Sequence, residues 1–104
     1  MALDKGKSFN GTGAGTSSGV TVTISASGNK THEATDIQCS GDAAALVTIE
    51  SPAATLIYRK RFTAAFNMSE QFLTPVRGAT GQAILVKISA STANCEANIQ
   101  GRSL

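Results

Sequence analysis

The stretch that decides the fold is QAILVKISASTANCEANIQ, which runs from Gln82 to Gln100. Its apolar residues recur at every second position on both sides of a short polar segment, Ser91-Thr92. A period of two is typical of a β-strand with one buried face, and two such runs around a short turn predict a β-hairpin. We expect this hairpin at the centre of the fold. The residues expected to face the core are Ile84, Val86, Ile88, Ala90, Ala93, Cys95, Ala97 and Ile99.

The same alternation recurs upstream, and turn residues separate the runs. The further strands are predicted at residues 20–26, 33–39, 43–50, 54–68 and within 69–80. The long run needs a bend or bulge near Lys60–Arg61 that splits it in two. Residues 69–80 are expected to form a short strand followed by a surface loop, with a helical turn at residues 69–73 as the alternative. Seven or eight short strands favour a sandwich or a small barrel. We predict an all-β, jelly-roll-like antiparallel β-sandwich.

Residues 1–18 differ in composition from the rest, because they are rich in Gly, Ser and Thr and lack a regular apolar period. Such a segment does not bury enough apolar surface to offset its own ordering entropy. The sequence therefore predicts a flexible N-terminal arm over 1–18 and one sandwich domain over 19–104. Within the arm, Leu3 and Phe9 are the apolar anchors for a partner, and Lys5 and Lys7 are the nearby cations.

The composition excludes several functional classes. The chain has 104 residues, a formal net charge of +2 and 15% charged residues, which is little positive charge for a nucleic-acid-binding protein. No apolar run is long enough to span a bilayer or to act as a signal peptide, so we expect no membrane partner and assembly in a cytoplasm.

No group of residues suggests catalysis. His32 is the only histidine and falls in a predicted turn, so we interpret it as a solvated residue rather than a general base. The acids Glu33, Asp36 and Asp42 lack the spacing of a calcium loop, although a shared calcium site is an alternative. Cys39 and Cys95 fall on the apolar phase of predicted strands and are expected to be buried thiols, although a disulfide is possible if the two strands are neighbours. Neither cysteine has a second Cys or His at the spacing of a metal site. We predict a protein that is not an enzyme and binds no cofactor or metal.

One charge cluster stands out, Arg59-Lys60-Arg61. Strand alternation places Arg59 and Arg61 on the face opposite Tyr58 and Phe62. A solvated strand face is one interpretation. The other is a docking patch for an acidic partner, extended by Lys87 or Arg77.

The Gly-rich N-terminal segment, the strand count and the closing GQAILVKISA…NCEANIQG motif resemble the small capsid cement, or decoration, proteins of tailed bacteriophages. The resemblance covers about residues 19–101. It implies a jelly-roll virion protein on the capsid exterior, with the major capsid protein and further copies of itself as partners, as a homodimer or homotrimer. Phage spike and receptor-binding modules have a similar composition and pattern of strands. A receptor- or carbohydrate-binding module of a spike or tail is therefore the alternative.

Overall fold

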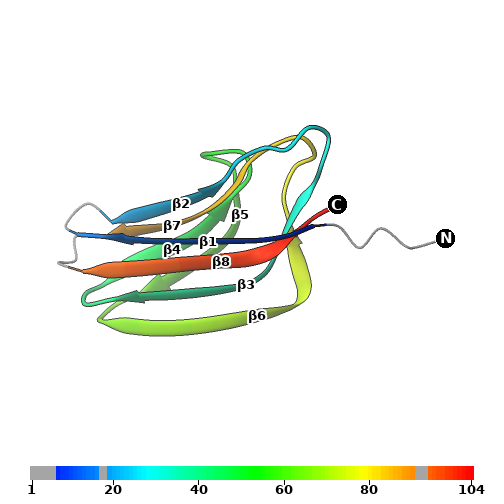
Figure 1. Ribbon diagram of the computed structural model, residues 1–104. Helices are drawn as coiled ribbons and strands as arrows, with labels where there is room; N and C mark the ends of the chain where they lie inside the picture. Colours follow the sequence, from blue (N-terminus) through cyan, green and yellow to red (C-terminus); the bar gives the residue numbers. More distant parts are fainter. Residues whose placement is uncertain (1–6, 17–18, 91–93) are drawn as a thin grey trace.

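The computed structural model describes residues 7–16, 19–90 and 94–104, and these form eight β-strands with no helix among them. Two four-stranded antiparallel sheets pack face to face as two layers (Figure 1). Sheet A has the order β1-β8-β3-β6, and sheet B has the order β2-β7-β4-β5. The strands are β1 (Lys7–Gly15), β2 (Val20–Ile24), β3 (His32–Gly41), β4 (Ala45–Glu50), β5 (Leu56–Phe62), β6 (Phe66–Arg77), β7 (Ile84–Ala90) and β8 (Cys95–Ser103). The predicted all-β sandwich is confirmed.

The pairing of the strands is nested along the chain. β1 pairs with β8, β2 with β7, β3 with β6 and β4 with β5, all antiparallel. Pairing between β3 and β8 joins the β1–β8 and β3–β6 pairs into one sheet, and pairing between β4 and β7 joins the β2–β7 and β4–β5 pairs into the other. One long hairpin rolled into two sheets is the jelly-roll arrangement. The first and last strands of this fold are therefore neighbours, although they are far apart in sequence.

Alternating side chains from both sheets fill the space between the layers. Ile84, Val86 and Ile88 of β7 and Ala97 and Ile99 of β8 are all buried, as the period of two predicted. The predicted hairpin is wrong, because β7 lies in sheet B and β8 in sheet A. Alternation shows that each strand has one buried face, but two strands facing each other across a core have the same pattern as two paired strands. The proposed turn Ser91-Thr92 lies outside the described residues.

The run over 54–68 is divided into two strands, as predicted. The break falls at residues 63–65, between β5 and β6, rather than near Lys60–Arg61. β6 then continues through the predicted loop and past Pro75, so the helical alternative is also wrong. Its register against β3 shifts between the pairs Asp36–Gln71 and Ala34–Val76, which leaves residues 72–75 opposite a single residue of β3. An edge strand tolerates proline and such a bulge, because one side of its ladder is free.

Residues 7–15 are a strand, and the predicted arm is wrong for this segment. β1 pairs with β8 in one continuous register from Lys7 to Gly15. Its inward positions are Phe9, Gly11, Gly13 and Gly15, which share rows with inward residues of β8. A Cβ on Gly11 or Gly13 would lie 2.8 Å from a methyl group of Val22 in sheet B. Glycine at these positions therefore lets the edge of sheet A approach β2 closely.

Candidate functional site

Charge is distributed unequally between the two sheets. The strands of sheet B carry four cations, Arg59, Lys60, Arg61 and Lys87, and one carboxylate, Glu50. The strands of sheet A carry three cations, Lys7, Arg77 and Arg102, and four carboxylates, Glu33, Asp36, Glu70 and Glu96. Sheet B is therefore the basic layer of the sandwich.

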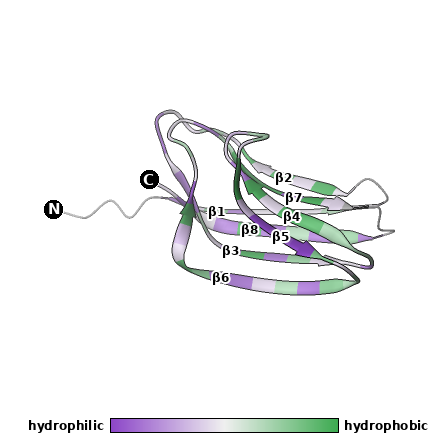
Figure 2. Ribbon diagram, turned by 180° about the vertical axis from the view of Figure 1, so that it is seen from behind, coloured by the Kyte–Doolittle hydropathy of each residue, from purple (hydrophilic) through white to green (hydrophobic). Residues whose placement is uncertain are grey.

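Three of the four cations share the outer face of sheet B. Arg59 and Lys87 both pair with Thr48 of the strand between them, and Arg61 pairs with Leu46 on the next outward row. We call Arg59, Arg61 and Lys87 the cationic face. Since neighbouring strands are about 5 Å apart, Arg59 and Lys87 are about 10 Å apart along their row. Both arginines are exposed, and Figure 2 shows the hydrophilic stretch of β5 that carries them.

Glu50 does not form an ion pair with this face. Its side chain is buried, with a hydrogen bond from Thr48 Oγ1 at 3.2 Å and another from the Ala54 backbone N–H at 2.7 Å. Within the described ranges, no ion pair involves Arg59, Arg61 or Lys87. The cationic face therefore presents charges that are available to an acidic partner.

Lys60 lies on the opposite face of β5. It pairs with Val47, which is fully buried, so it occupies an inward position at the edge of the sandwich. Its Nζ is 5.7 Å from the centroid of the Phe62 ring, an arrangement that allows a cation–π contact. The pleat therefore divides the sequence cluster Arg59-Lys60-Arg61 between two faces.

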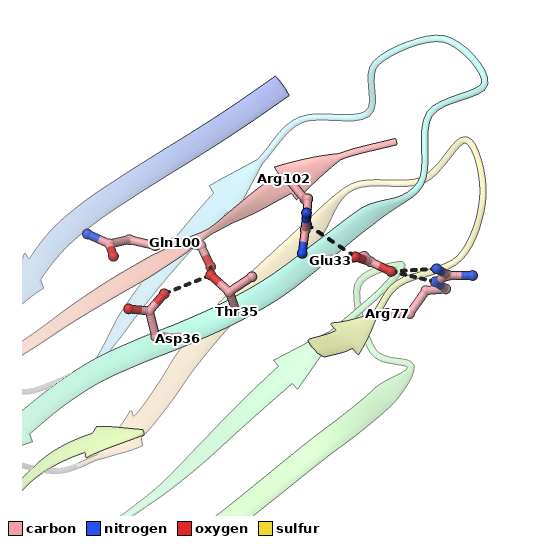
Figure 3. Close-up of polar contacts among 6 residues, drawn as sticks. All are labelled: Glu33, Thr35, Asp36, Arg77, Gln100 and Arg102. Atoms are coloured by element: carbon pink, nitrogen blue, oxygen red, sulfur yellow. Dashed lines mark hydrogen bonds and ion pairs between the residues drawn. The ribbon is translucent and has the colours of Figure 1, made fainter. Parts of the chain in front are cut away.

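Arg77 does not extend the cationic face, because it belongs to sheet A. Its Nε donates to Glu33 Oε2 at 2.8 Å, and its guanidinium forms an ion pair with the same oxygen at 2.6 Å (Figure 3). Arg102 approaches Glu33 from the other flanking strand, with 3.7 Å between Nε and Oε1. Glu33 is buried between these two arginines. The group is an internal ion-pair network of sheet A.

His32 is not the solvated turn residue that we expected. It is the first residue of β3 and is 1% exposed. Its Nε2 lies 2.8 Å from the carbonyl oxygen of Ser25, and its Nδ1 lies 2.6 Å from Ser103 Oγ. A carbonyl only accepts, so Nε2 carries the proton and donates it. These contacts tie the start of β3 to the end of β8, and the ring has no free nitrogen for catalysis.

The three acids considered for calcium do not converge. Glu33 is held by the arginines, Asp36 accepts a hydrogen bond from Thr35 Oγ1 at 2.8 Å (Figure 3), and Asp42 accepts one from the Asn94 N–H at 3.2 Å. No group of three His, Cys, Asp or Glu side chains within the described residues is placed to hold a metal ion.

Cys39 and Cys95 are free, buried thiols on the neighbouring strands β3 and β8. Cys39 pairs with Ala97 and Cys95 pairs with Gly41, so the two cysteines are diagonal neighbours. Burial raises the pKa of the Cys39 thiol from its ordinary 9.0 to about 11, with a smaller contribution from Cys95, while a backbone hydrogen bond from Asn98 opposes the shift. The thiol therefore stays protonated and unreactive at neutral pH.

All five aromatic rings of the chain pack in pairs at the sandwich interior. Phe9 meets His32 at 5.4 Å, Tyr58 meets Phe72 at 5.2 Å, and Phe62 stacks on Phe66 at 4.2 Å between ring centroids. Each of the five rings is partly buried against the core, so none is a fully exposed platform of the kind that stacks on a sugar. The Tyr58 hydroxyl also lies 3.4 Å from Glu70, and burial, with Glu70 second, raises its pKa.

The residues predicted to bind a partner differ in how exposed they are, and two of them lie outside the described part of the chain. Leu3 and Lys5 lie outside the described residues. Lys7 is exposed at the start of β1, whereas Phe9 is partly buried against the core of its own domain. Arg59 and Arg61 are exposed and share one face, as the alternation predicted. No described helix is long and apolar enough to cross a membrane.

Comparisons with known proteins do not assign this chain to a group. No family model matches it, and neither the curated proteins nor the solved structures searched contain a match.

Proposed function

We propose that this protein is a non-enzymatic capsid cement protein, which binds the major capsid protein on the outside of a tailed-phage head. The observation that carries the proposal is the cationic face, where Arg59, Arg61 and Lys87 project from one sheet without an ion-pair partner in the described part of the chain. Charges placed in this way favour an acidic protein surface and steer association.

The rest of the fold supports a mechanical role. A cement protein needs a rigid body whose surfaces match those of its neighbours, and it needs no reacting groups. The nested strand pairs tie both ends of the chain into sheet A, and the side chains that suggested chemistry are held inside the protein: His32 between Ser25 and Ser103, and Glu33 between two arginines. Many copies on a symmetric shell would add their weak contacts to a high avidity.

The first test is the location and copy number of the protein. Quantitative mass spectrometry of purified virions should find it at hundreds of copies, and cryo-electron microscopy should place sheet B against the shell. Absence from virions would overturn the proposal. A few copies at the tail would instead favour the receptor- or carbohydrate-binding alternative.

The second test concerns the cationic face itself. Arg61→Glu should weaken binding to shells assembled without the protein by about tenfold at low salt, and much less at high salt, because an exposed charge pair is screened. Lys30→Glu is the matched control, since it makes the same change in net charge at an exposed residue between β2 and β3. If both variants lost the same amount of shell binding, the effect would come from net charge alone, and the arginines would be ordinary solvated residues.

A further inference from the structure

The free edges of the two sheets differ in how well they are protected against pairing with another chain. Natural β-proteins block exposed edges with bulges, prolines, inward-pointing charges or short strands. Three of the four edge strands here are blocked in this way. β6 has Pro75, its bulge and the inward Glu70; β5 has a register shift and the inward Lys60; and β2 has only five residues.

β1 has only one of these features, the charge of its first residue Lys7, which is in phase with the inward Phe9. It is nine residues long, its register against β8 is uninterrupted, and no charged residue or proline occurs after Lys7. Its outward residues are small or polar and exposed: Ser8, Asn10, Thr12 and Ala14. Apart from the ladder with β8 and a hydrogen bond from Cys95 Sγ to the Gly15 carbonyl oxygen at 3.6 Å, no hydrogen bond involves the backbone of residues 7–15 in the part of the chain that the structure describes. One side of this nine-residue strand is therefore available for pairing.

We propose that β1 pairs with β1 of a second copy of this chain, antiparallel and around a two-fold axis. The strand is complementary to itself in size and charge. When the whole strand overlaps its copy, Gly11 faces Gly11, Phe9 faces Gly13 and Lys7 faces Gly15 of the second copy. No like charges meet, and each large residue lies opposite a glycine, which is a favourable cross-strand arrangement. Two-fold pairing of identical surfaces is also the commonest way in which proteins form oligomers.

The pairing joins the two A sheets into one continuous eight-stranded sheet. A two-fold axis between antiparallel strands is perpendicular to the sheet, so the outer faces of both A sheets lie on one side and both cationic faces lie on the other. The dimer therefore presents two copies of Arg59, Arg61 and Lys87 in the same direction, which would increase avidity for an acidic surface. The dimer does not depend on the proposed function, because its test uses the purified protein alone.

The first experiment measures the association state of the full chain by sedimentation equilibrium up to about 100 µM, where a micromolar dimer is fully formed. Asn10→Lys with Thr12→Lys places lysines of one copy opposite lysines of the other and should raise the dissociation constant at least about tenfold. The control, Asn67→Lys with Ser69→Lys, adds the same charge to exposed positions of β6 at the other edge of sheet A and should leave dimerisation unchanged. A monomer over the whole range, or equal effects of the two variants, would overturn the proposal.

The second experiment tests the register. In the full overlap, Asn10 faces Thr12 of the second copy, so Asn10→Cys and Thr12→Cys should form an intermolecular disulfide when the two variants are mixed and oxidised. Each variant alone should form little. The native Cys39 and Cys95 are buried and should not compete. Thr21→Cys, on the exposed outer face of β2, is the control. Cross-linking through Thr21→Cys but not through the mixture would place the interface elsewhere and contradict pairing through β1.

Discussion

The two long sides of the sandwich are built by different means. On the β1–β2 side, glycines at inward positions of β1 let the sheets approach until Gly11 and Gly13 touch Val22. On the β5–β6 side, the gap is filled by the ring pairs Tyr58–Phe72 and Phe62–Phe66. That side also places a charge at an inward position of each edge strand, Lys60 on β5 and Glu70 on β6.

The difference shows that the space between two sheets can be packed in two ways: glycines let the sheets approach each other, or large side chains fill the gap. Close approach on the glycine side buries Val22 without a side chain at Gly11 or Gly13 of β1. The aromatic side uses large residues and leaves its edge strands partly exposed. The first solution depends on exact backbone spacing and should be intolerant of added volume, whereas the second should tolerate small losses.

The largest effect should come from removing β1. Deletion of residues 7–15 leaves one edge of β8 without a partner and uncovers Val22 and Ile99, so we expect a loss of at least about 4 kcal/mol and little folded protein. Urea denaturation followed by circular dichroism measures this loss. Deletion of residues 2–6 keeps β1 intact and is the control. A 7–15 deletion that melts like the full chain would mean that the strand adds nothing to the sandwich.

A single added side chain should be the next most damaging change. Gly13→Val places carbon atoms where a Cβ alone would already lie 2.8 Å from Val22 and 3.2 Å from Val20, so the sheets must separate. We expect a cost of about 3 kcal/mol in the free energy of unfolding. Ala14→Val, at the next residue on the exposed outer face, should cost less than about 0.5 kcal/mol. Similar costs for the two variants would contradict close packing on this side.

The β1–β2 side also shows what the sequence could and could not predict. The strands with aliphatic residues at alternate positions were predicted because branched side chains mark the buried face. In β1 the same period of two is present as Phe9, Gly11, Gly13 and Gly15. Because glycine has no apolar side chain to mark the buried face, the segment was interpreted as an arm. Alternating glycines between small polar residues were the signal for a closely packed strand.

The site could be predicted only in part for a related reason. Alternation correctly placed Arg59 and Arg61 on one face, since that depends on neighbours in sequence. Lys87 belongs to the cationic face, and Arg77 is instead paired with Glu33, because of which strands pair and in which register. Those pairings join residues far apart in the chain, and the local pattern of polar and apolar residues does not determine them.

On the aromatic side, truncation should cost less than crowding costs on the glycine side. Phe62→Ala removes a ring that stacks on Phe66 but is partly exposed, so we expect a loss of about 2 kcal/mol. Chemical denaturation measures it, with Phe62→Leu as the conservative control that keeps most of the apolar volume. A loss larger than that of Gly13→Val would reverse the proposed order of the two sides.

Between the two sides, Cys39 provides a pH-dependent measure of an intact core. Its pKa is raised to about 11 by burial, so between pH 9 and pH 11 the folded state keeps a proton that the unfolded state releases. This contribution to stability is complete below the ordinary pKa of the thiol and is lost as pH rises through the raised one. The melting temperature should fall over this range more for the wild type than for Cys39→Ala. Parallel curves for the two proteins would mean that the thiol is solvated.

The smallest effect on stability should come from Lys60→Ile. This substitution tests whether an inward charge keeps the edge strand β5 from pairing with another chain. Isoleucine at this inward position continues the apolar row of Val47, so the free energy of unfolding should change by less than about 0.5 kcal/mol. The substitution also removes the charge that hinders strand addition at β5, and self-association measured by light scattering should increase. Arg59→Ile is the control, because it removes the same charge from the same strand on the outer face. If both variants associate to the same extent, net charge rather than the inward lysine keeps this edge apart, and the two sides of the sandwich do not differ in protection in the way proposed.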